Sequence, residues 1–284
     1  MGIDIGQALR EGASRTAAKN GLILAAVFAG IALLTTVLLQ SLALGFTELL
    51  VEAMQEVSPE ELEGITQEEY NEFMTEAEEF RDIVPLALGI SAGIAAGGLL
   101  AVALVAEAVS IIAVRIFSSD ETETIPAEIA ADNILLATLN GFVGKIIVWG
   151  LIILGSIFFL LPGLILAVLF YFVRQEIAIK DKNFVQAMAD SWRVTKGNRI
   201  EVFLVGFVLV VVSQLEAVTS ALLGIVSTTT GLIGAAIVGG LLASFGAAVA
   251  TRAYVQLDEG DAGAGDEEPK DPYDAALGPD DLPQ

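Results

Sequence analysis

Long apolar blocks are the feature that most constrains this chain. Several run for about 20 residues with few or no charged side chains, the length that a helix needs to cross roughly 30 Å of hydrocarbon. Lipid cannot satisfy backbone N–H and C=O groups, so only helices or a closed barrel span a membrane. Barrel strands alternate apolar and polar residues, and these blocks do not. The sequence therefore predicts an all-α, polytopic integral membrane bundle of about six transmembrane helices.

The blocks place these spans in a membrane domain of residues 1–257. We expect them at 21–44, 83–114, 141–161, 163–179, 200–223 and 231–255. A tight turn at Pro162-Gly163 is expected between the third and the fourth. Residues 1–20 and 180–199 carry apolar side chains at helical spacing among basic ones. This pattern predicts amphipathic helices on the inner membrane surface.

Segments 5–20, 126–140 and 184–198 resemble one another, since each is amphipathic and leads directly into a span. Their similarity favours a threefold arrangement of a surface helix followed by a hairpin. Independent convergence of juxtamembrane helices is the alternative.

Basic residues set the expected orientation. They flank the spans on one side and are nearly missing on the other, where the 48–82 segment has only Arg81. Because lysine and arginine mark the cytoplasmic side, we expect a multi-pass protein of the cell membrane with both termini in the cytoplasm. The 48–82 segment then lies outside.

Acidic residues dominate the aqueous parts. The chain has 36 acids against 14 bases, a formal net charge of −22. They concentrate in 48–82 and in 258–284, a tail that we expect to be disordered because it has little apolar content. Such a surface is typical of a halophilic organism in multimolar salt, where screening shortens to roughly 3 Å or less. Binding of cations or of a basic protein partner is the alternative, whereas nucleic-acid binding is disfavoured because no basic patch exists.

The 48–82 insert shows helix signals. Ser58 and Thr66 each begin a capping pattern with a glutamate three residues later. After the second, five apolar residues recur at helical spacing: Tyr70, Phe73, Met74, Ala77 and Phe80. The insert is thus predicted to be a small helical cap, whose apolar stripe packs against the membrane domain or receives a partner.

Cysteine and histidine are both absent. Disulfides, thiolate chemistry and histidine acid–base catalysis are therefore excluded, and any metal site would use only oxygen ligands. With no nucleophile–base set and no glycine-rich phosphate loop, we expect neither an enzyme nor a bound cofactor.

Two stripes of small residues predict close helix contacts, because small side chains let two backbones approach. The spacing does not say whether the contact lies within one chain or between chains, and intrachain packing is the default expectation for a six-helix bundle. The first stripe is Gly89, Gly93, Gly97 and Ala101, and the second is Ala236, Gly240, Ser244 and Ala248.

Ionisable residues within spans are costly, and they are therefore candidates for a functional site. Four are expected near the inner leaflet boundary and can form one polar layer: Glu107, Lys145, Arg174 and Glu201. Glu107 is expected to pair with Lys145 or Arg174. The layer is interpreted either as a substrate or ion site, or as paired and snorkelling interfacial residues.

Residues 161–174 and 187–198 resemble a known family, the six-span membrane domain found beside glycerophosphodiester phosphodiesterases and in related proteins, many from haloarchaea. The residues that match its pattern are Pro162, Gly163, Arg174, Ala187, Ser191, Trp192, Thr195 and Gly197. The resemblance implies a six-span archaeal membrane domain. It does not carry over the phosphodiesterase activity, since the chain has no histidine, and it does not explain the acidic insert.

Two functional hypotheses follow. The first is a non-catalytic membrane module that binds or organises a protein partner through 48–82, the inner-surface helices or 258–284. The second is a transporter or lipid-handling protein that uses the polar layer of Glu107, Lys145 and Arg174. In either case the lipid bilayer surrounds the spans.

Overall fold

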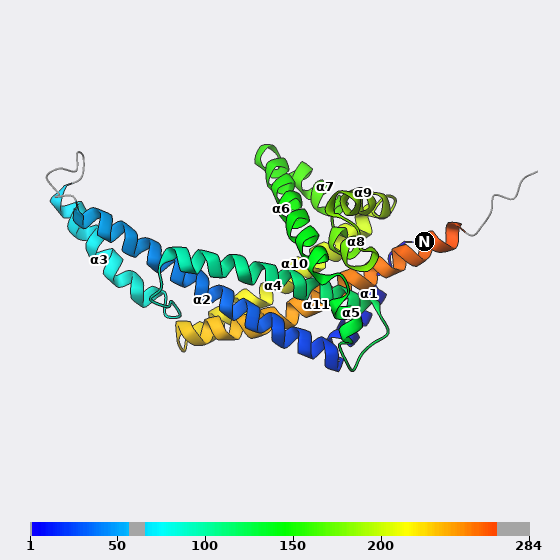
Figure 1. Cartoon of the computed structure of the whole chain (residues 1–284), viewed down its shortest axis with the longest axis horizontal. Coiled ribbons are helices and arrows are strands. Elements are labelled where there is room, and N and C mark those ends of the chain that lie inside the picture. Colours follow the sequence, from blue (N-terminus) through cyan, green and yellow to red (C-terminus); the bar gives the residue numbers. More distant parts are fainter. Residues whose placement is uncertain (1, 57–65, 266–284) are drawn as a thin grey trace, which may run out of the picture.

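The computed structural model describes residues 2–56 and 66–265, and the chain is all-α within these ranges. Its helices are α1 (Ile5–Ala17), α2 (Lys19–Glu56), α3 (Gln67–Ile83), α4 (Ala92–Ser118), α5 (Ala127–Ala131), α6 (Ile134–Phe158), α7 (Leu160–Leu169), α8 (Val173–Lys180), α9 (Phe184–Val194), α10 (Arg199–Gly224) and α11 (Thr228–Gly265) (Figure 1). Among the described residues, 6 helical stretches are long and apolar enough to cross a membrane: Lys19–Glu56, Ala92–Ser118, Ile134–Ile157, Leu160–Lys180, Arg199–Gly224 and Thr228–Glu259. The predicted all-α, multi-pass membrane fold is confirmed.

Helix α11 is the centre of the bundle. Figure 1 shows α2, α4, α10 and α11 running along the long axis, and α11 packs against α1, α2, α4 and α10. Gly240 lets α2 approach, since a Cβ there would lie 2.4 Å from Ala29 N and 2.5 Å from Ala25 O. Ser244 Oγ donates a hydrogen bond to Gly21 O at 3.0 Å. The predicted contact through the second stripe is confirmed, since its members are all buried: Ala236, Gly240, Ser244 and Ala248.

The first stripe makes no such contact with any described residue. Its members are exposed, and a Cβ added to any of its glycines would meet nothing within 4 Å: Gly89, Gly93, Gly97 and Ala101. Helix α4 instead turns Ala95 and Gly98 toward its neighbours, and a Cβ at Gly98 would lie 3.0 Å from Leu38 Cδ2. The expected intrachain packing of this stripe is wrong, because small-residue spacing makes a smooth surface without selecting its partner.

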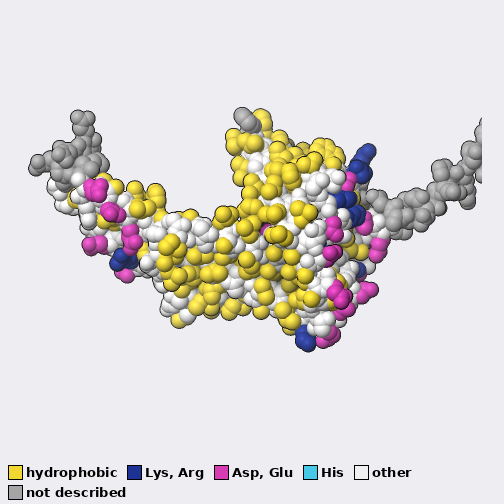
Figure 2. Space-filling view, viewed as in Figure 1, with side chains coloured by type: hydrophobic (Ala, Val, Ile, Leu, Met, Phe, Trp, Pro, Cys, Tyr) yellow, Lys and Arg dark blue, Asp and Glu magenta, His cyan; other side chains and the backbone are white. Residues whose placement is uncertain are grey.

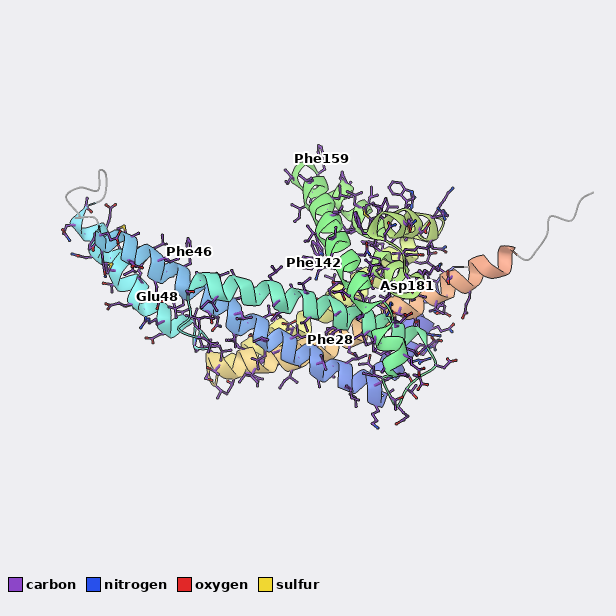
Figure 3. All side chains as sticks on the ribbon, in the orientation of Figure 1. Phe28, Phe46, Glu48, Phe142, Phe159 and Asp181 are labelled. Carbon is purple, nitrogen blue, oxygen red and sulfur yellow. The ribbon has the colours of Figure 1, made fainter. Side chains whose placement is uncertain are left out.

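Helices α6 and α7 form a tight hairpin that leaves the bundle at a steep angle to α4 (Figure 1). The chain reverses at Phe159, at the tip of the hairpin (Figure 3), so the predicted turn at Pro162-Gly163 is wrong. Pro162 lies in the first turn of α7, where a missing N–H removes no helical hydrogen bond. Gly163 lets α7 press against α6, since a Cβ there would lie 1.9 Å from Ser156 Oγ. The pair therefore starts α7 and closes the hairpin.

The bundle has two chemically distinct ends. Helices α1, α5, α8 and α9 gather at one, called here the α1 end, and α3 folds back on α2 at the other, the α3 end (Figure 1). Figure 2 shows hydrophobic side chains over the middle of the molecule and charged ones gathered toward both ends. This distribution fits a bundle whose middle lies in lipid.

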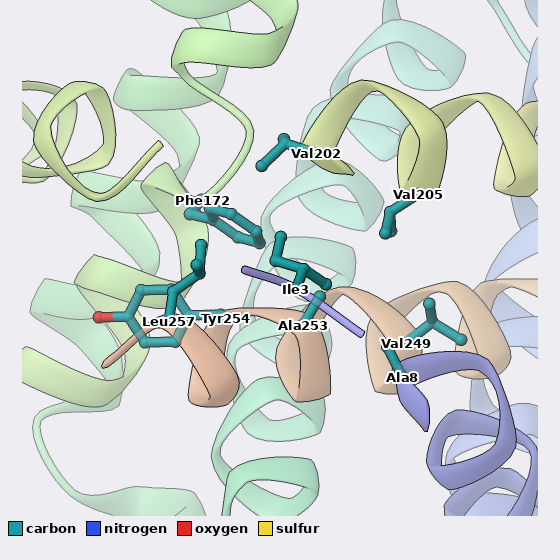
Figure 4. Packing of buried hydrophobic residues seen from close by; sticks show 9 residues of the cluster. All are labelled: Ile3, Ala8, Phe172, Val202, Val205, Val249, Ala253, Tyr254 and Leu257. Atoms are coloured by element: carbon teal, nitrogen blue, oxygen red, sulfur yellow. The ribbon is translucent and has the colours of Figure 1, made fainter. Parts of the chain in front are cut away.

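A core cluster joins the elements of the α1 end. It draws side chains from the N-terminal segment, the α7–α8 junction, α10 and α11 (Figure 4). Helix α1 is seated on α11, since a Cβ at Gly12 would lie 2.3 Å from Val249 Cγ2. The amphipathic helices expected at 1–20 and 180–199 are thus α1 and α9, packed on the bundle. The corresponding helix of 126–140, α5, spans only Ala127–Ala131, so the second copy of the expected repeat is much shorter.

Arg115 fastens the last turn of α4 to α5 and α8. Its guanidinium donates to Ala178 O at 2.8 Å, to Ile129 O at 3.4 Å and to Asp132 O. It also pairs with Asp181 at 3.0 Å. The side chain is only 7% exposed, so burial has removed most of its hydrogen bonds to water. The contacts with these protein groups replace them.

Helix α3 confirms the helical cap. Thr66 and Glu69 form the predicted capping box, with Thr66 Oγ1 accepting from Glu69 N and the Glu69 carboxylate accepting from Thr66 N. The Thr66 hydrogen bonds also lower the pKa of Glu69. The predicted stripe is the half-buried face of α3: Tyr70, Phe73, Met74, Ala77 and Phe80. The helix start expected at Ser58 lies outside the described residues.

Several helix boundaries differ from the expected ones. Helix α4 begins at Ala92, later than the span expected from 83, and α6 begins at Ile134, earlier than the span expected from 141. Helix α11 continues to Gly265, so 258–265 is helical and the tail expected to be disordered does not begin at 258. The rest of that tail, 266–284, lies outside the described residues.

Candidate functional site

A break in the fourth span positions the site. Helix α7 ends at Leu169 and α8 begins at Val173, which leaves backbone polar groups open inside an apolar segment. Ser191 of α9 forms hydrogen bonds with two of these groups: its Oγ accepts from Phe172 N at 3.2 Å and donates to Leu169 O at 2.9 Å. Ser191 is fully buried. The α9 helix thus fixes the first turn of α8, which carries Arg174.

Glu107 of α4 and Arg174 form a two-pronged ion pair. Arg174 Nε donates to Glu107 Oε1 at 2.9 Å, and Arg174 Nη2 donates to Oε2 at 3.1 Å. The Glu107 side chain is 1% exposed, whereas that of Arg174 is 38% exposed. Because a buried carboxylate without a partner is very costly, Arg174 supplies the opposite charge and the hydrogen bonds that Glu107 needs. The predicted pairing of Glu107 is confirmed.

Lys145 of α6 completes a group of three charges. Its Nζ lies 3.8 Å from Glu107 Oε2, too far for a hydrogen bond, and its side chain is 48% exposed. Lys145 donates no hydrogen bond to any described residue. One carboxylate therefore faces two cations, which leaves a formal charge of +1 and free donors on Lys145.

Glu201 does not belong to this group. It lies in the first turn of α10, and its Oε1 is 3.9 Å from a Cβ built at Gly2. Among the described residues it makes no ion pair. Of the predicted polar layer, the structure thus brings together Glu107, Lys145 and Arg174, whereas Glu201 lies beside the N-terminal segment.

A cleft opens beside the three charges. Its volume is about 150 Å³, and its walls come from α4, α6 and the α7–α8 segment: Glu107, Gly141, Lys145, Val148, Trp149, Phe170, Tyr171, Val173, Arg174 and Ile177. Gly141 leaves room for the Glu107 carboxylate, since a Cβ at Gly141 would lie 2.8 Å from Glu107 Oε1. The cleft lies between α4, α6 and the α7–α8 segment. The α6–α7 hairpin, called here the apolar wedge, leaves the bundle there (Figure 1) and is covered with hydrophobic side chains (Figure 2).

Glu176 is a buried acid that the sequence interpretation missed. It accepts from Tyr254 Oη at 2.8 Å and pairs with Lys182 at 2.6 Å and with Lys180 at 3.6 Å. Its side chain is fully buried. The Glu176–Lys180 spacing of one helical turn is the signal that was available for one of these contacts. The contact with Tyr254 depends on how α8 meets α11.

Asp190 of α9 continues this network toward the solvent. It pairs with Lys182 at 2.5 Å and with Arg193 at 2.8 Å. The hydrogen bond from Lys182 holds the pKa of Asp190 below its ordinary value, while burial opposes this shift. The Glu176 network joins α8, α9 and α11, which indicates a structural role.

The Glu107 site combines a fixed ion pair, a second cation and an apolar approach. Within the described ranges, no group of three acidic residues is arranged to hold a metal ion. The exposed donors of Lys145 and Arg174 instead offer hydrogen bonds to an anion at a place surrounded by aromatic and aliphatic side chains. This chemistry suits a ligand with a negative headgroup and a hydrocarbon body.

Comparison with known proteins gives one family. A family model described as a domain of unknown function (DUF7847) matches residues 3–257, which include every described helix through most of α11. No curated protein and no solved structure matched the chain.

Proposed function

Since the chain belongs to the DUF7847 family, whose description assigns no activity, we propose its function from the Glu107 site: a non-catalytic membrane module that binds an anionic phospholipid. The observation that carries the proposal is the excess positive charge beside a buried carboxylate. Lys145 Nζ has no hydrogen-bond acceptor among the described residues, although it lies within a predicted span. A phosphate supplies acceptors and balances the charge, and basic pockets between transmembrane helices bind such headgroups.

The apolar wedge supports a lipid over a free anion. Side chains beside the cleft are exposed and apolar, including Trp149 at 57% and Ile153 at 55%. Acyl chains can lie along this face while the phosphate reaches Lys145 and Arg174. Glu107 lies eight residues before Arg115 on α4, about 12 Å deeper at 1.5 Å per residue. A phosphate bound there lies deeper in the membrane than the ordinary headgroup region. This depth suits a lipid-handling protein.

The test is lipid co-purification. We would purify the full chain from native membranes in multimolar salt and identify bound lipids by mass spectrometry. Wild-type protein should retain stoichiometric phospholipid, and Lys145→Ala should lower the retained amount about ten-fold, since it removes a charged hydrogen-bond donor. Lys145→Arg should restore it.

Lys196→Ala is the matched control, because Lys196 is an exposed lysine outside the cleft. Equal lipid content in Lys145→Ala and Lys196→Ala would contradict the proposal. Glu107→Gln should change the amount of lipid retained by the purified protein. The amount of protein in the membrane should stay unchanged, since glutamine still accepts a hydrogen bond from Arg174.

Partner organisation is the second candidate function, and one observation favours it. Helices α2 and α3 form a groove of about 580 Å³ whose walls include Glu48, Glu52, Glu78 and Met74. A basic amphipathic segment of another protein would suit this groove. A stoichiometric protein in the same purification, lost when 52–80 is deleted, would favour this function. The expected resemblance to the phosphodiesterase-associated membrane domain implies neither function.

A further inference from the structure

A groove among α2, α10 and α11 carries polar groups within the apolar part of the bundle. Helix α11 packs against both α2 and α10, so it forms the floor of the groove and they form its walls (Figure 1). The groove measures about 540 Å³, is open on its outer side and shares no residue with the Glu107 cleft. Alanines and one leucine line it together with five polar residues: Thr35, Thr36, Ser213, Glu216 and Ser220.

Glu216 lies deep in the fifth span. It is eight residues before the end of α10 at Gly224, about 12 Å at 1.5 Å per residue. The turn that follows is itself apolar, with Ile225 83% and Val226 78% exposed, so the membrane boundary lies at or beyond it. Gly239 of α11 leaves room for the carboxylate, since a Cβ there would lie 3.0 Å from Glu216 Oε2. The carboxylate therefore lies against the floor of the groove, below the membrane surface.

Glu216 has no counter-charge in the groove. None of the described residues that line it is a lysine or an arginine, and Glu216 forms neither an ion pair nor a hydrogen bond with a described residue. Its side chain is exposed, so a ligand from outside the chain can reach it. A carboxylate within a span is costly, and such residues usually pair with another group or mark the path of an ion. The groove therefore lacks one positive charge.

The hydroxyl groups narrow the chemistry of the ligand. Thr35, Thr36 and Ser213 each donate their one proton to a carbonyl of their own helix, at 2.8, 3.0 and 2.8 Å. Their oxygens keep lone pairs and have no proton left to donate to a ligand. Ser213, Glu216 and Ser220 are three and four residues apart, which places them on one face of α10. Both walls of the groove thus offer oxygen acceptors.

Oxygen acceptors around a single negative charge suit a small cation, because hard metal cations take oxygen ligands. One carboxylate balances one positive charge, which favours a monovalent ion over a divalent one. The alanines and the leucine of the groove offer no group that would bind an anion. We propose that Glu216 and the hydroxyls of Thr35, Thr36 and Ser213 bind a monovalent metal cation within the membrane. This site is independent of the anionic-lipid site.

The test measures how fast dicyclohexylcarbodiimide modifies Glu216 of the full chain in lipid nanodiscs. The reagent reacts with protonated carboxyl groups in apolar surroundings, whereas a bound cation keeps the carboxyl deprotonated. Mass spectrometry should find Glu216 labelled in choline chloride. Replacing choline with sodium at constant total salt should slow the labelling, to about one tenth when sodium is ten times its dissociation constant, because only the empty site reacts. Glu107, paired with Arg174, is the internal control and should not respond to sodium.

Each outcome bears on the proposal without any variant. Equal labelling in sodium and in choline, or no labelling of Glu216 in choline, would overturn it, since the empty site must carry a protonated carboxyl. Protection by methylammonium but not by sodium would overturn it in favour of an organic ammonium ligand. Protection by potassium as well as by sodium would support it.

Variants of the groove sharpen the test. Thr36→Val removes one oxygen and keeps the side-chain shape, so about five-fold more sodium should be needed for equal protection, as expected for one lost polar contact. Thr47→Val is the matched control, because Thr47 also donates to a carbonyl of α2, at 3.0 Å, and lies outside the groove. Glu216→Gln should abolish the labelling. Equal sodium requirements in Thr36→Val and Thr47→Val would refute the assignment.

Discussion

At the residue scale, burial and pairing distinguish acids that look alike in the sequence. Glu107 and Glu176 both lie within spans and are both buried, yet their partners differ. Glu176 pairs with two lysines and a tyrosine that hold α8, α9 and α11 together. Glu107 lines a cleft in which two cations, Lys145 and Arg174, face its single carboxylate. The candidate site is thus identified by the Lys145 ammonium group, which donates no hydrogen bond to a described residue, rather than by the buried Glu107 carboxylate.

Arg174→Gln tests the pairing of Glu107. The substitution removes the two charged hydrogen bonds of the buried carboxylate and leaves only Lys145, 3.8 Å away, which should cost about 3–5 kcal/mol of stability. We expect a lower thermal unfolding midpoint in detergent. The double variant Glu107→Gln/Arg174→Gln should recover most of the loss, since it removes the orphaned charge. A double variant as unstable as the single one would show that Arg174 acts through another contact.

The ion pairs of Asp190 predict that the thermal stability of the protein depends on pH. Its pKa lies below the ordinary value of 3.8 because Lys182 donates to it, although burial opposes this effect. The ionised form therefore stabilises the fold above that pH, and the contribution is lost as the pH falls through the lower, folded pKa. Wild-type protein should lose thermal stability below about pH 3.8 more steeply than Asp190→Asn. Parallel pH profiles would contradict this role.

At the element scale, the two small-residue stripes have the same spacing and opposite outcomes. The stripe of α11 packs on α2, whereas the stripe of α4 faces outward. The break between α7 and α8 is another feature of this scale, because Ser191 from α9 makes an interrupted span tolerable. The α6–α7 hairpin gains its tight contact from Gly163. Helix contacts thus depend on partners that a single segment does not specify.

Gly240→Leu and Gly97→Leu form a matched pair. At Gly240 a Cβ would lie 2.4 Å from the backbone of α2, so leucine must push the helices apart and should destabilise the protein by several kcal/mol. At Gly97 nothing lies within 4 Å, and leucine should change stability by less than about 0.5 kcal/mol. Thermal unfolding in detergent measures both. A large loss at Gly97 would indicate a contact between copies of the chain.

At the scale of the whole molecule, the apolar middle and the charged ends fit one orientation in a membrane (Figure 2). The expected arrangement places the α1 end in the cytoplasm and the α3 end outside. The exposed α6–α7 hairpin gives the molecule an apolar wedge, and the Glu107 site lies at its base.

Single-cysteine labelling tests this orientation directly, because the chain has no cysteine of its own. Glu72 and Lys196 are exposed at opposite ends of the bundle. A membrane-impermeant maleimide should label Glu72→Cys in intact cells, and Lys196→Cys only after lysis. The reverse pattern would overturn the proposed topology, and labelling of both in intact cells would contradict a sealed span between them.

The sequence by itself determined the fold class, the six apolar stretches, the α3 cap and the identity of three site residues. These depend on quantities that add up along one segment: apolar transfer free energy, helical period and local capping. The structure alone decided which stripe packs, that Glu201 lies beside the N-terminal segment, and that the fourth span is interrupted where Ser191 of α9 meets it. Each of these depends on the tilt and rotation of one helix against another, and no single segment encodes that relation.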